Sequence, residues 1–167
     1  GIHYLKGGWL DPRALCRALL SHPKINLREH CGQVTLKRTS QNTWVAIDPD
    51  NRPLAEAPIA TLATAHATQL HDGLDWLALN VIRGQTTHLK QSEAASLMSV
   101  ALCDQGYLAP ARQGIHCMGA SYDVGDMELA MRDADHRHNI DMICKALPDL
   151  RIAPPKAGWK GHVAFRC

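Results

Sequence analysis

The sequence predicts an α+β fold with mixed helices and strands, in one domain or one lobe of a larger domain. Short apolar runs of strand length recur along the chain, two segments have the composition of helices, and the two kinds follow no regular βαβ order. The 167 residues allow roughly 70% of the unfolded surface to be buried. Hydrophobic residues make up 46% and charged residues 20% of the sequence, which are ordinary values for a globular protein.

The first half of the chain predicts one helix and several strands. Asp11 is suited to cap a helix and Pro12 to occupy its first position, so residues 13–20 are expected to be helical, after a short opening strand that ends before Gly7. The last apolar run of this half is uninterrupted, which indicates a strand buried on both faces. Strands are expected within residues 25–37, at 44–47 and at 59–65, with a turn at 48–51.

The second half predicts three strands and a long helix. The polar residues 111–114 are expected to join two strands as a turn, and Pro148 to end the helix. Residues 79–89 form a further segment with no assigned structure, and residues 92–99 fit either a loop or a helix. The strands are expected at residues 107–109, 115–121 and 160–166, and the helix at 128–147.

The cysteines are dispersed rather than arranged as a disulfide framework. A chain of this length has a core large enough to fold without disulfides, and Cys103 and Cys117 lie in strand-like apolar runs. We therefore expect reduced thiols in a cytoplasmic protein. The six cysteines are Cys16, Cys31, Cys103, Cys117, Cys144 and Cys167.

The net charge and the hydropathy of the sequence give no indication of binding to nucleic acid or to a membrane. A formal net charge of +2 does not by itself indicate nucleic-acid binding. No apolar run approaches the roughly 20 residues of a membrane helix, so no membrane contact is expected. Among the ten histidines, His136 and His138 are two positions apart on a predicted helix, and His30 with Cys31 has no second pair at ligand spacing. No metal site is expected.

A dinucleotide cofactor normally needs a glycine-rich turn that opens a helix, where backbone N–H groups meet the pyrophosphate. The sequence contains no G-x-G-x-x-G pattern. Gly7 and Gly8 are followed by the bulky Trp9, and the glycines near the end precede no predicted helix. These residues alone therefore supply no pyrophosphate site.

A set of spaced residues nevertheless resembles a family of flavoenzymes. The chain has a Tyr-x-x-Pro strand at Tyr107 and Pro110, a Gly-Ala-Ser strand at 119–121, a helix, and then Arg166. This order resembles the substrate domain of the glycine-oxidase/D-amino-acid-oxidase family. The resemblance implies that residues 1–78 are an incomplete FAD-binding lobe whose fingerprint lies upstream. It also implies that residues 79–167 are the mixed-sheet substrate domain, cut before the closing FAD-binding segment.

The resemblance assigns two groups of site residues. The first group would contact FAD and departs from the family at Ala65, where relatives have glycine. The second would hold a substrate carboxylate, because a guanidinium binds a carboxylate through two hydrogen bonds and a tyrosine hydroxyl adds another donor. By spacing alone these would be a surface arginine and a core tyrosine. The first group is Val34, Ala63, Thr64, Ala65, Arg83 and Gly84; the second is Arg166, Tyr107 and Tyr122.

The details His116-Cys117 and Tyr122 resemble the tRNA-modifying branch of the family. This implies an FAD-dependent oxidoreductase that removes the carboxymethyl group from 5-carboxymethylaminomethyl-(2-thio)uridine at the tRNA wobble position, with an upstream methyltransferase domain that uses S-adenosylmethionine. One alternative is an oxidase of free glycine or sarcosine. Another is an inactive core that folds without cofactor. The chain by itself is expected to bind no FAD and to be inactive.

Overall fold

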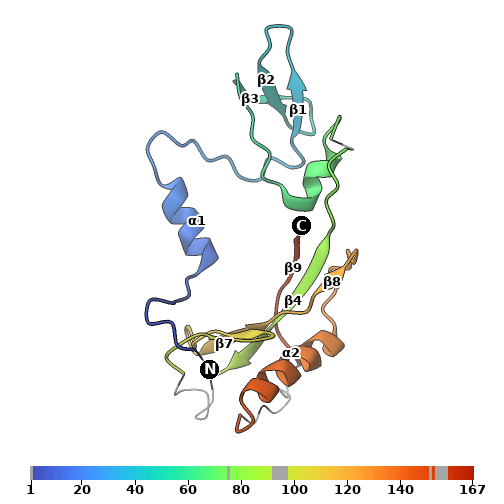
Figure 1. Cartoon of the computed structure of the whole chain (residues 1–167). Helices are drawn as coiled ribbons and strands as arrows, with labels where there is room; N and C mark the ends of the chain where they lie inside the picture. Colours follow the sequence, from blue (N-terminus) through green and yellow to red (C-terminus); the bar gives the residue numbers. More distant parts are fainter. Residues whose placement is uncertain (1, 75, 92–97, 151, 153–157) are drawn as a thin grey trace. The chain divides into compact units, whose positions relative to one another are not determined.

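The computed structural model describes residues 2–74, 76–91, 98–150, 152 and 158–167 (Figure 1). The chain forms two compact units. Unit 1 comprises Gly1–Trp9 and Asn80–Cys167, and unit 2 comprises Leu10–Leu79. No helix in the described ranges has both the length and the apolar character of a membrane span.

Unit 2 begins with the predicted helix. Helix α1 runs from Pro12 to Leu20, and the Asp11 carboxylate accepts hydrogen bonds from the backbone N–H groups of Arg13 at 2.9 Å and Ala14 at 3.3 Å. The prediction of a capping aspartate followed by a first-turn proline is therefore confirmed. The expected opening strand before it is wrong, because residues 2–6 form only a turn and irregular backbone.

A three-stranded antiparallel sheet follows, with strands β1 (Thr35–Arg38), β2 (Trp44–Ile47) and β3 (Pro53–Ala57) in sequence order. Within the predicted region 25–37 only the end is a strand. The turn after β2 is held by Asp48, whose carboxylate accepts the N–H groups of Asp50 and Arg52, each at 2.9 Å. Hydrogen bonds from the Arg52 backbone N–H and from the Arg52 side chain to the Asp48 carboxylate lower the pKa of Asp48.

The prediction of a buried strand at residues 59–65 is wrong. Residues 58–64 have no regular structure, and a 3₁₀ helix, η1, spans Ala65–Leu70. Ile59 is 79% exposed. An uninterrupted apolar run is typical of a strand buried on both faces, but it is equally compatible with an irregular segment that lines a groove. The periodicity of the sequence does not distinguish these two structures.

Unit 1 is built on a six-stranded antiparallel sheet whose central strand is β4 (Ile82–Lys90). Strand β4 pairs with β7 through residues 86–90, with β8 through 82–83 and with β9 through 82–85. Strand β6 lies between β5 and β7. The bounds are β5 Leu102–Cys103, β6 Tyr107–Leu108, β7 Ile115–Gly119, β8 Asp123–Val124 and β9 Val163–Arg166.

These strands confirm most of the second-half predictions. The predicted strands at 107–109, 115–121 and 160–166 correspond to β6, β7 and β9, with ends that shift by up to three residues. The segment 79–89, for which no structure was predicted, contains most of β4. Lys160, the predicted start of the last strand, forms a single bridge with His88 before β9 begins. Of the ambiguous segment 92–99, residues 92–97 lie outside the described residues.

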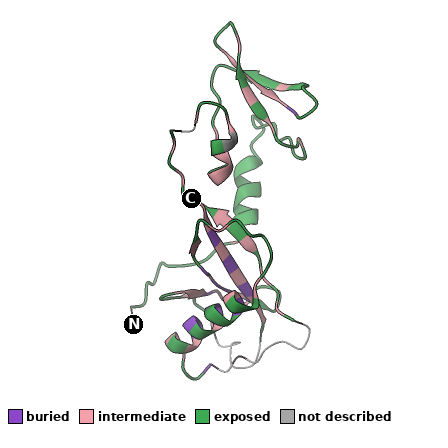
Figure 2. Cartoon of the chain, turned by 90° about the vertical axis from the view of Figure 1, so that its right-hand side faces the viewer, coloured by how far each residue is buried: buried purple, intermediate pink, exposed green. Residues whose placement is uncertain are grey.

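Helix α2 (Asp133–Ala146) packs on one face of this sheet (Figure 1). Residues 83, 85 and 87 of β4 are buried, whereas 82, 84, 86 and 88 are only partly buried (Figure 2). Successive strand residues point to opposite faces, so α2 covers the face of the odd-numbered residues. The apolar core on this side consists of Leu108, Met118, Ile143 and Leu150.

The helix starts five residues later than the predicted 128. Residues 128–132 are not helical, because the carbonyl groups of Glu128 and Ala130 accept hydrogen bonds from the buried Arg83. A composition that favours helix is thus overridden by a tertiary contact. The helix ends at Ala146, just before Pro148, as predicted.

Candidate active site

The face of the unit 1 sheet turned away from α2 is called here the open face. On β4 it carries Ile82, Gly84, Thr86, His88 and Lys90, the residues that alternate with those buried under α2. Residues directly opposite one another on antiparallel strands share a face. The strand register therefore assigns the side chains of the neighbouring strands to the open face or to the helix-covered face.

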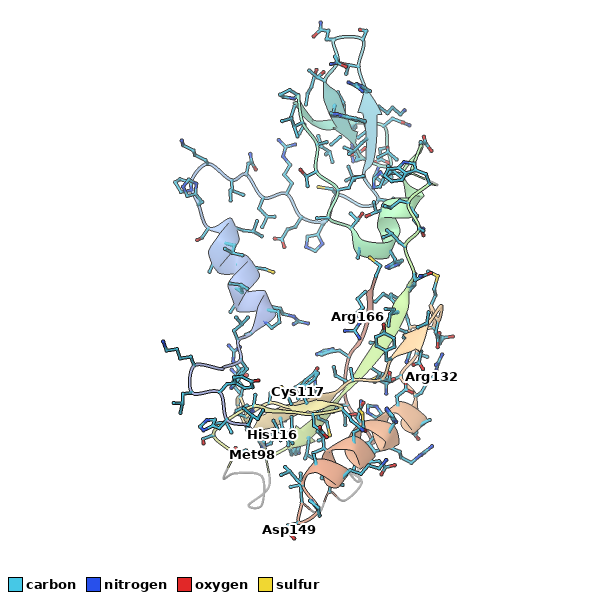
Figure 3. The ribbon with its side chains drawn as sticks, in the orientation of Figure 1. Met98, His116, Cys117, Arg132, Asp149 and Arg166 are labelled. Atoms are coloured by element: carbon cyan, nitrogen blue, oxygen red, sulfur yellow. The ribbon has the colours of Figure 1, made fainter. Side chains whose placement is uncertain are left out.

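Arg166 lies on the open face, because it pairs with Ile82. Its guanidinium lies 4.8 Å from the centre of the Tyr122 ring, and both side chains are exposed (Figure 3). Val124 pairs with Ile82 from the other edge of β4 and completes this row. Stacking on a ring leaves the edge of a guanidinium free, so Arg166 can still grip a carboxylate through two hydrogen bonds.

Tyr107 lies on the same face, opposite Gly119, which in turn pairs with Thr86. Its hydroxyl is 4.0 Å from the Cys117 sulfur. Burial, together with the neighbouring Cys117, raises the pKa of Tyr107 to about 12. The phenol therefore keeps its proton at neutral pH and remains a hydrogen-bond donor.

The structure brings Tyr122, rather than Tyr107, to Arg166. Across the sheet, Arg166 lies level with Ile82 of β4, and Tyr107 lies level with Thr86. These two positions are four residues, or about 13 Å, apart along the strand. Gly84 and Ala164 pair between these two positions, and Gly119 lies beside them, opposite Tyr107. These three residues are called here the small-residue patch.

The glycines of this small-residue patch are closely bounded on the open face. A Cβ atom added at Gly84 would lie 3.3 Å from the Ser121 carbonyl oxygen, and one added at Gly119 would lie 3.3 Å from the Thr86 Cα. Because the two glycines carry no side chain, a bound group can approach the backbone more closely there than at a residue with a Cβ atom.

His116 and Cys117 point to opposite faces of β7, as the alternation of a strand requires (Figure 3). His116 is fully buried on the helix-covered side, with Nδ1 2.8 Å from the Ala109 carbonyl oxygen. Cys117 lies on the open face. The two side chains do not act on one substrate atom.

The side chain of Arg83 corrects one predicted cofactor contact. It points under α2, is fully buried, and donates through Nε to Glu128, through Nη1 to Asp135 and through Nη2 to Gln85 and Ala130, at 2.6–3.0 Å. This leaves its guanidinium committed to internal partners. Arg83 fixes the loop before α2 to the sheet, and the sequence pattern around it did not reveal this role.

The predicted FAD contacts of unit 2 gather around a groove of about 570 Å³. Val34 and Thr64 both line it. Ala63 and Ala65 flank Thr64 in the chain, and Ala65 has a φ of 48°, the left-handed conformation that favours glycine. Apart from a few polar groups the lining is aliphatic and aromatic, and includes Leu36, Trp44, Ala46, Ile59 and Leu62.

This groove fits part of FAD. Apolar walls with a few polar groups suit a flat aromatic ring such as adenine. The chain supplies no glycine-rich turn for the pyrophosphate, so we expect the purified chain of residues 1–167 to be colourless and free of flavin. Absorbance spectroscopy after addition of excess FAD and gel filtration measures this. Stoichiometric retention of flavin would contradict the expectation.

The described residues contain no group of three or more metal-binding side chains close enough to hold an ion. All six cysteines are free thiols in the structure. Cys16, Cys103 and Cys167 are exposed and the other three are partly buried.

Known proteins match the chain over its whole length. The family model described as "FAD dependent oxidoreductase" matches residues 1–167. The protein named "tRNA 5-methylaminomethyl-2-thiouridine biosynthesis bifunctional protein MnmC" from Saccharophagus degradans is 34% identical over 166 residues, 99% of this chain and 24% of that protein. Proteins of the same name from Chromobacterium violaceum and Pseudomonas fluorescens are 36% and 37% identical and are each matched over 26% of their length.

The chain thus spans about a quarter of the length of the curated relatives it matches. Among solved structures, iminodiacetate oxidase (IdaA) from Chelativorans sp. BNC1 aligns with a TM-score of 0.61 and 17% sequence identity, over 81% of this chain and 37% of that one. This likeness confirms the predicted α+β fold class. The match over the full chain establishes that it belongs to the family of FAD dependent oxidoreductases.

Proposed function

We propose that the chain is part of an FAD-dependent enzyme that removes the carboxymethyl group from 5-carboxymethylaminomethyl-(2-thio)uridine at the wobble position of tRNA. One observation carries the proposal: Arg166, Tyr122 and Tyr107 share the open face, around a patch of small residues. Relatives 34–37% identical to the chain are named for the biosynthesis of a 5-methylaminomethyl-2-thiouridine in tRNA.

In this proposal Arg166 binds the carboxylate of the carboxymethylaminomethyl arm, and Tyr122 holds the guanidinium in place by stacking. Tyr107, whose pKa is about 12, contributes a neutral O–H donor on the same face. At the small-residue patch the arm can approach the backbone closely, because the glycines carry no side chain. These residues orient the arm, and orientation is the main contribution that a protein makes to cofactor chemistry.

The chemistry that FAD supplies when bound is two-electron oxidation of the C–H bond next to an amine nitrogen. Water then splits the resulting imine, which leaves an aminomethyl group on the uridine and releases glyoxylate. Val34 and Thr64 would contribute to the adenine part of the FAD site through the groove of unit 2. Within unit 1, Gly84 lies on the open face that carries Arg166, where the substrate arm would bind.

The intact protein would carry further parts. The relatives are named bifunctional, and we propose an upstream methyltransferase domain that uses S-adenosylmethionine to complete the modification. The six free cysteines suit a reducing compartment, and we propose a cytoplasmic location.

The proposal is tested with the intact protein, loaded with FAD and given three substrates separately: tRNA that carries the carboxymethylaminomethyl group, glycine and sarcosine. Nucleoside mass spectrometry follows the tRNA, and peroxide release follows the amino acids. We expect efficient conversion of the tRNA alone. Preferential oxidation of glycine or sarcosine would replace the proposal with a free amino-acid oxidase, and a protein that retains no flavin would favour a cofactor-free core.

A further inference from the structure

Charge is distributed unequally between the two sides of the unit 1 sheet. On the helix-covered side, acidic residues occupy β8, α2 and the loop between them. They are Asp123, Asp126, Glu128, Asp133, Asp135 and Asp141. Asp123 faces this side, because it pairs with Arg83 on β4. In the described strands of unit 1, the register places no carboxylate on the open face.

The open face instead carries basic side chains along β9 and the end of β4. Arg166 pairs with Ile82 and Lys160 with His88, so both point to this face, with His162 between them. The rings of His88 and His162 meet edge to face, with centres 4.7 Å apart, which confirms that the two histidines share the face. These two histidines, together with Lys90 and Lys160, are called here the basic strip.

The two lysines carry the charge of the basic strip. Both are exposed. Burial lowers the pKa of His88, and the electrostatic effect of the nearby His162 and His136 lowers it further. The His88 ring is therefore mostly neutral at neutral pH and contributes hydrogen bonding and stacking. Lys160 lies six residues before Arg166, which is about 20 Å along an extended strand.

We propose that the basic strip binds the sugar-phosphate backbone of an RNA strand whose modified base reaches Arg166. The inference rests on the proposed function and adds the surface that recognises the nucleic acid. Charge complementarity selects the partner, because the open face offers lysines without a carboxylate beside them in the described strands. On the helix-covered side, Asp126 and Asp135 pair with Arg132 and Arg83. The other four carboxylates there outnumber the exposed Arg137 and Lys145, so this side attracts phosphates less. Tyr107 and Tyr122 add exposed or half-buried rings on the same face, and single-stranded RNA is commonly bound by aromatic stacking beside a basic groove.

A charge-matched pair of variants tests the proposal in the intact protein. The test variant is Lys90→Gln/Lys160→Gln. The control is Arg137→Gln/Lys145→Gln, which removes two exposed positive charges from α2 on the other side of the sheet. The affinity for unmodified tRNA is measured by fluorescence anisotropy at several salt concentrations, without any oxidation step.

We expect the test variant to bind tRNA roughly tenfold more weakly and the slope of log affinity against log salt to shrink by about 1.4, at about 0.7 per lost phosphate contact. The control should stay near the unchanged protein. Equal losses in both variants would overturn the proposal, since they would reflect net charge alone. So would an unchanged affinity in the test variant, or an equal loss of binding to phosphatidylserine vesicles, which would indicate a membrane surface.

The outcome is separable from that of the proposed function. A loss of tRNA binding in the test variant, in a protein that oxidises no carboxymethylaminomethyl group, would keep the RNA surface and reject the reaction. Normal tRNA binding by the test variant, with normal oxidation, would keep the reaction and reject the surface. Arg166→Lys serves as a third reference, because it should impair oxidation and leave tRNA binding largely intact.

Discussion

Replacing Arg83 with methionine should destabilise unit 1 by about 3–5 kcal/mol, the usual consequence of removing one partner from a buried ion pair. Arg83 is fully buried, and its loss would strand the Asp135 carboxylate and the carbonyls of Glu128 and Ala130. Methionine fills similar space, so the loss is electrostatic and not a cavity effect. Chemical denaturation of the intact protein, with proteolysis to identify the unit that opens, provides the measurement.

Arg137→Met is the control for the Arg83 variant. It removes the same charge from an exposed position on α2, where single ion pairs contribute about 1 kcal/mol or less. Similar stability of the two variants would mean that the hydrogen bonds of Arg83 are replaced by water. In that case the loop before α2 would not depend on it.

Arg166→Lys should lower the catalytic efficiency of the intact enzyme by roughly tenfold to a hundredfold, because lysine keeps the charge and loses the two-bond geometry toward a carboxylate. Lysine also lacks the guanidinium that lies 4.8 Å from the centre of the Tyr122 ring. Tyr107→Phe should lower the efficiency less, since only one donor is removed. Steady-state kinetics on undermodified tRNA, with flavin content determined for each variant, measures both effects.

Flavin content should be the same in both variants, since neither residue lies in the groove of unit 2. Oxidation by Arg166→Lys at the normal rate would show that the carboxylate is held elsewhere. Arg166 would then be only a surface arginine that stacks on a neighbouring ring.

The sequence predicted the elements whose signals are local. Asp11 and Pro12 define the start of α1, and Pro148 follows the end of α2. The run at 59–65 was predicted wrongly because apolar composition records burial of some kind but does not say against what. The start of α2 was predicted wrongly because Arg83, 45 positions before Glu128 in the chain, takes the loop's carbonyl groups.

The residues of the candidate site could be predicted only where they belong to a motif of the family that is contiguous or regularly spaced in the sequence. Arg166, Tyr107 and Tyr122 were named from such a pattern, but their arrangement depends on strand register. The contact of Tyr122 with Arg166 joins the irregular residue before β8 to strand β9, and no sequence spacing predicts it. Part of the basic strip did have a signal in the sequence: Lys160 and His162 lie four and two positions before Ala164 in a predicted strand that ends at Arg166, so that all of these even-numbered residues share one face.

Strand β4 divides its residues between two tasks in strict alternation. The odd positions Arg83, Gln85 and Thr87 anchor the helix, and the even positions from Ile82 to Lys90 form the floor of the open face. Over evolutionary time such a strand can exchange one side chain for another at many positions, but it cannot gain or lose a single residue. One insertion would turn the anchoring arginine toward solvent and the substrate floor toward the helix. Related sequences should therefore vary in length at their turns and keep the spacing within this strand constant.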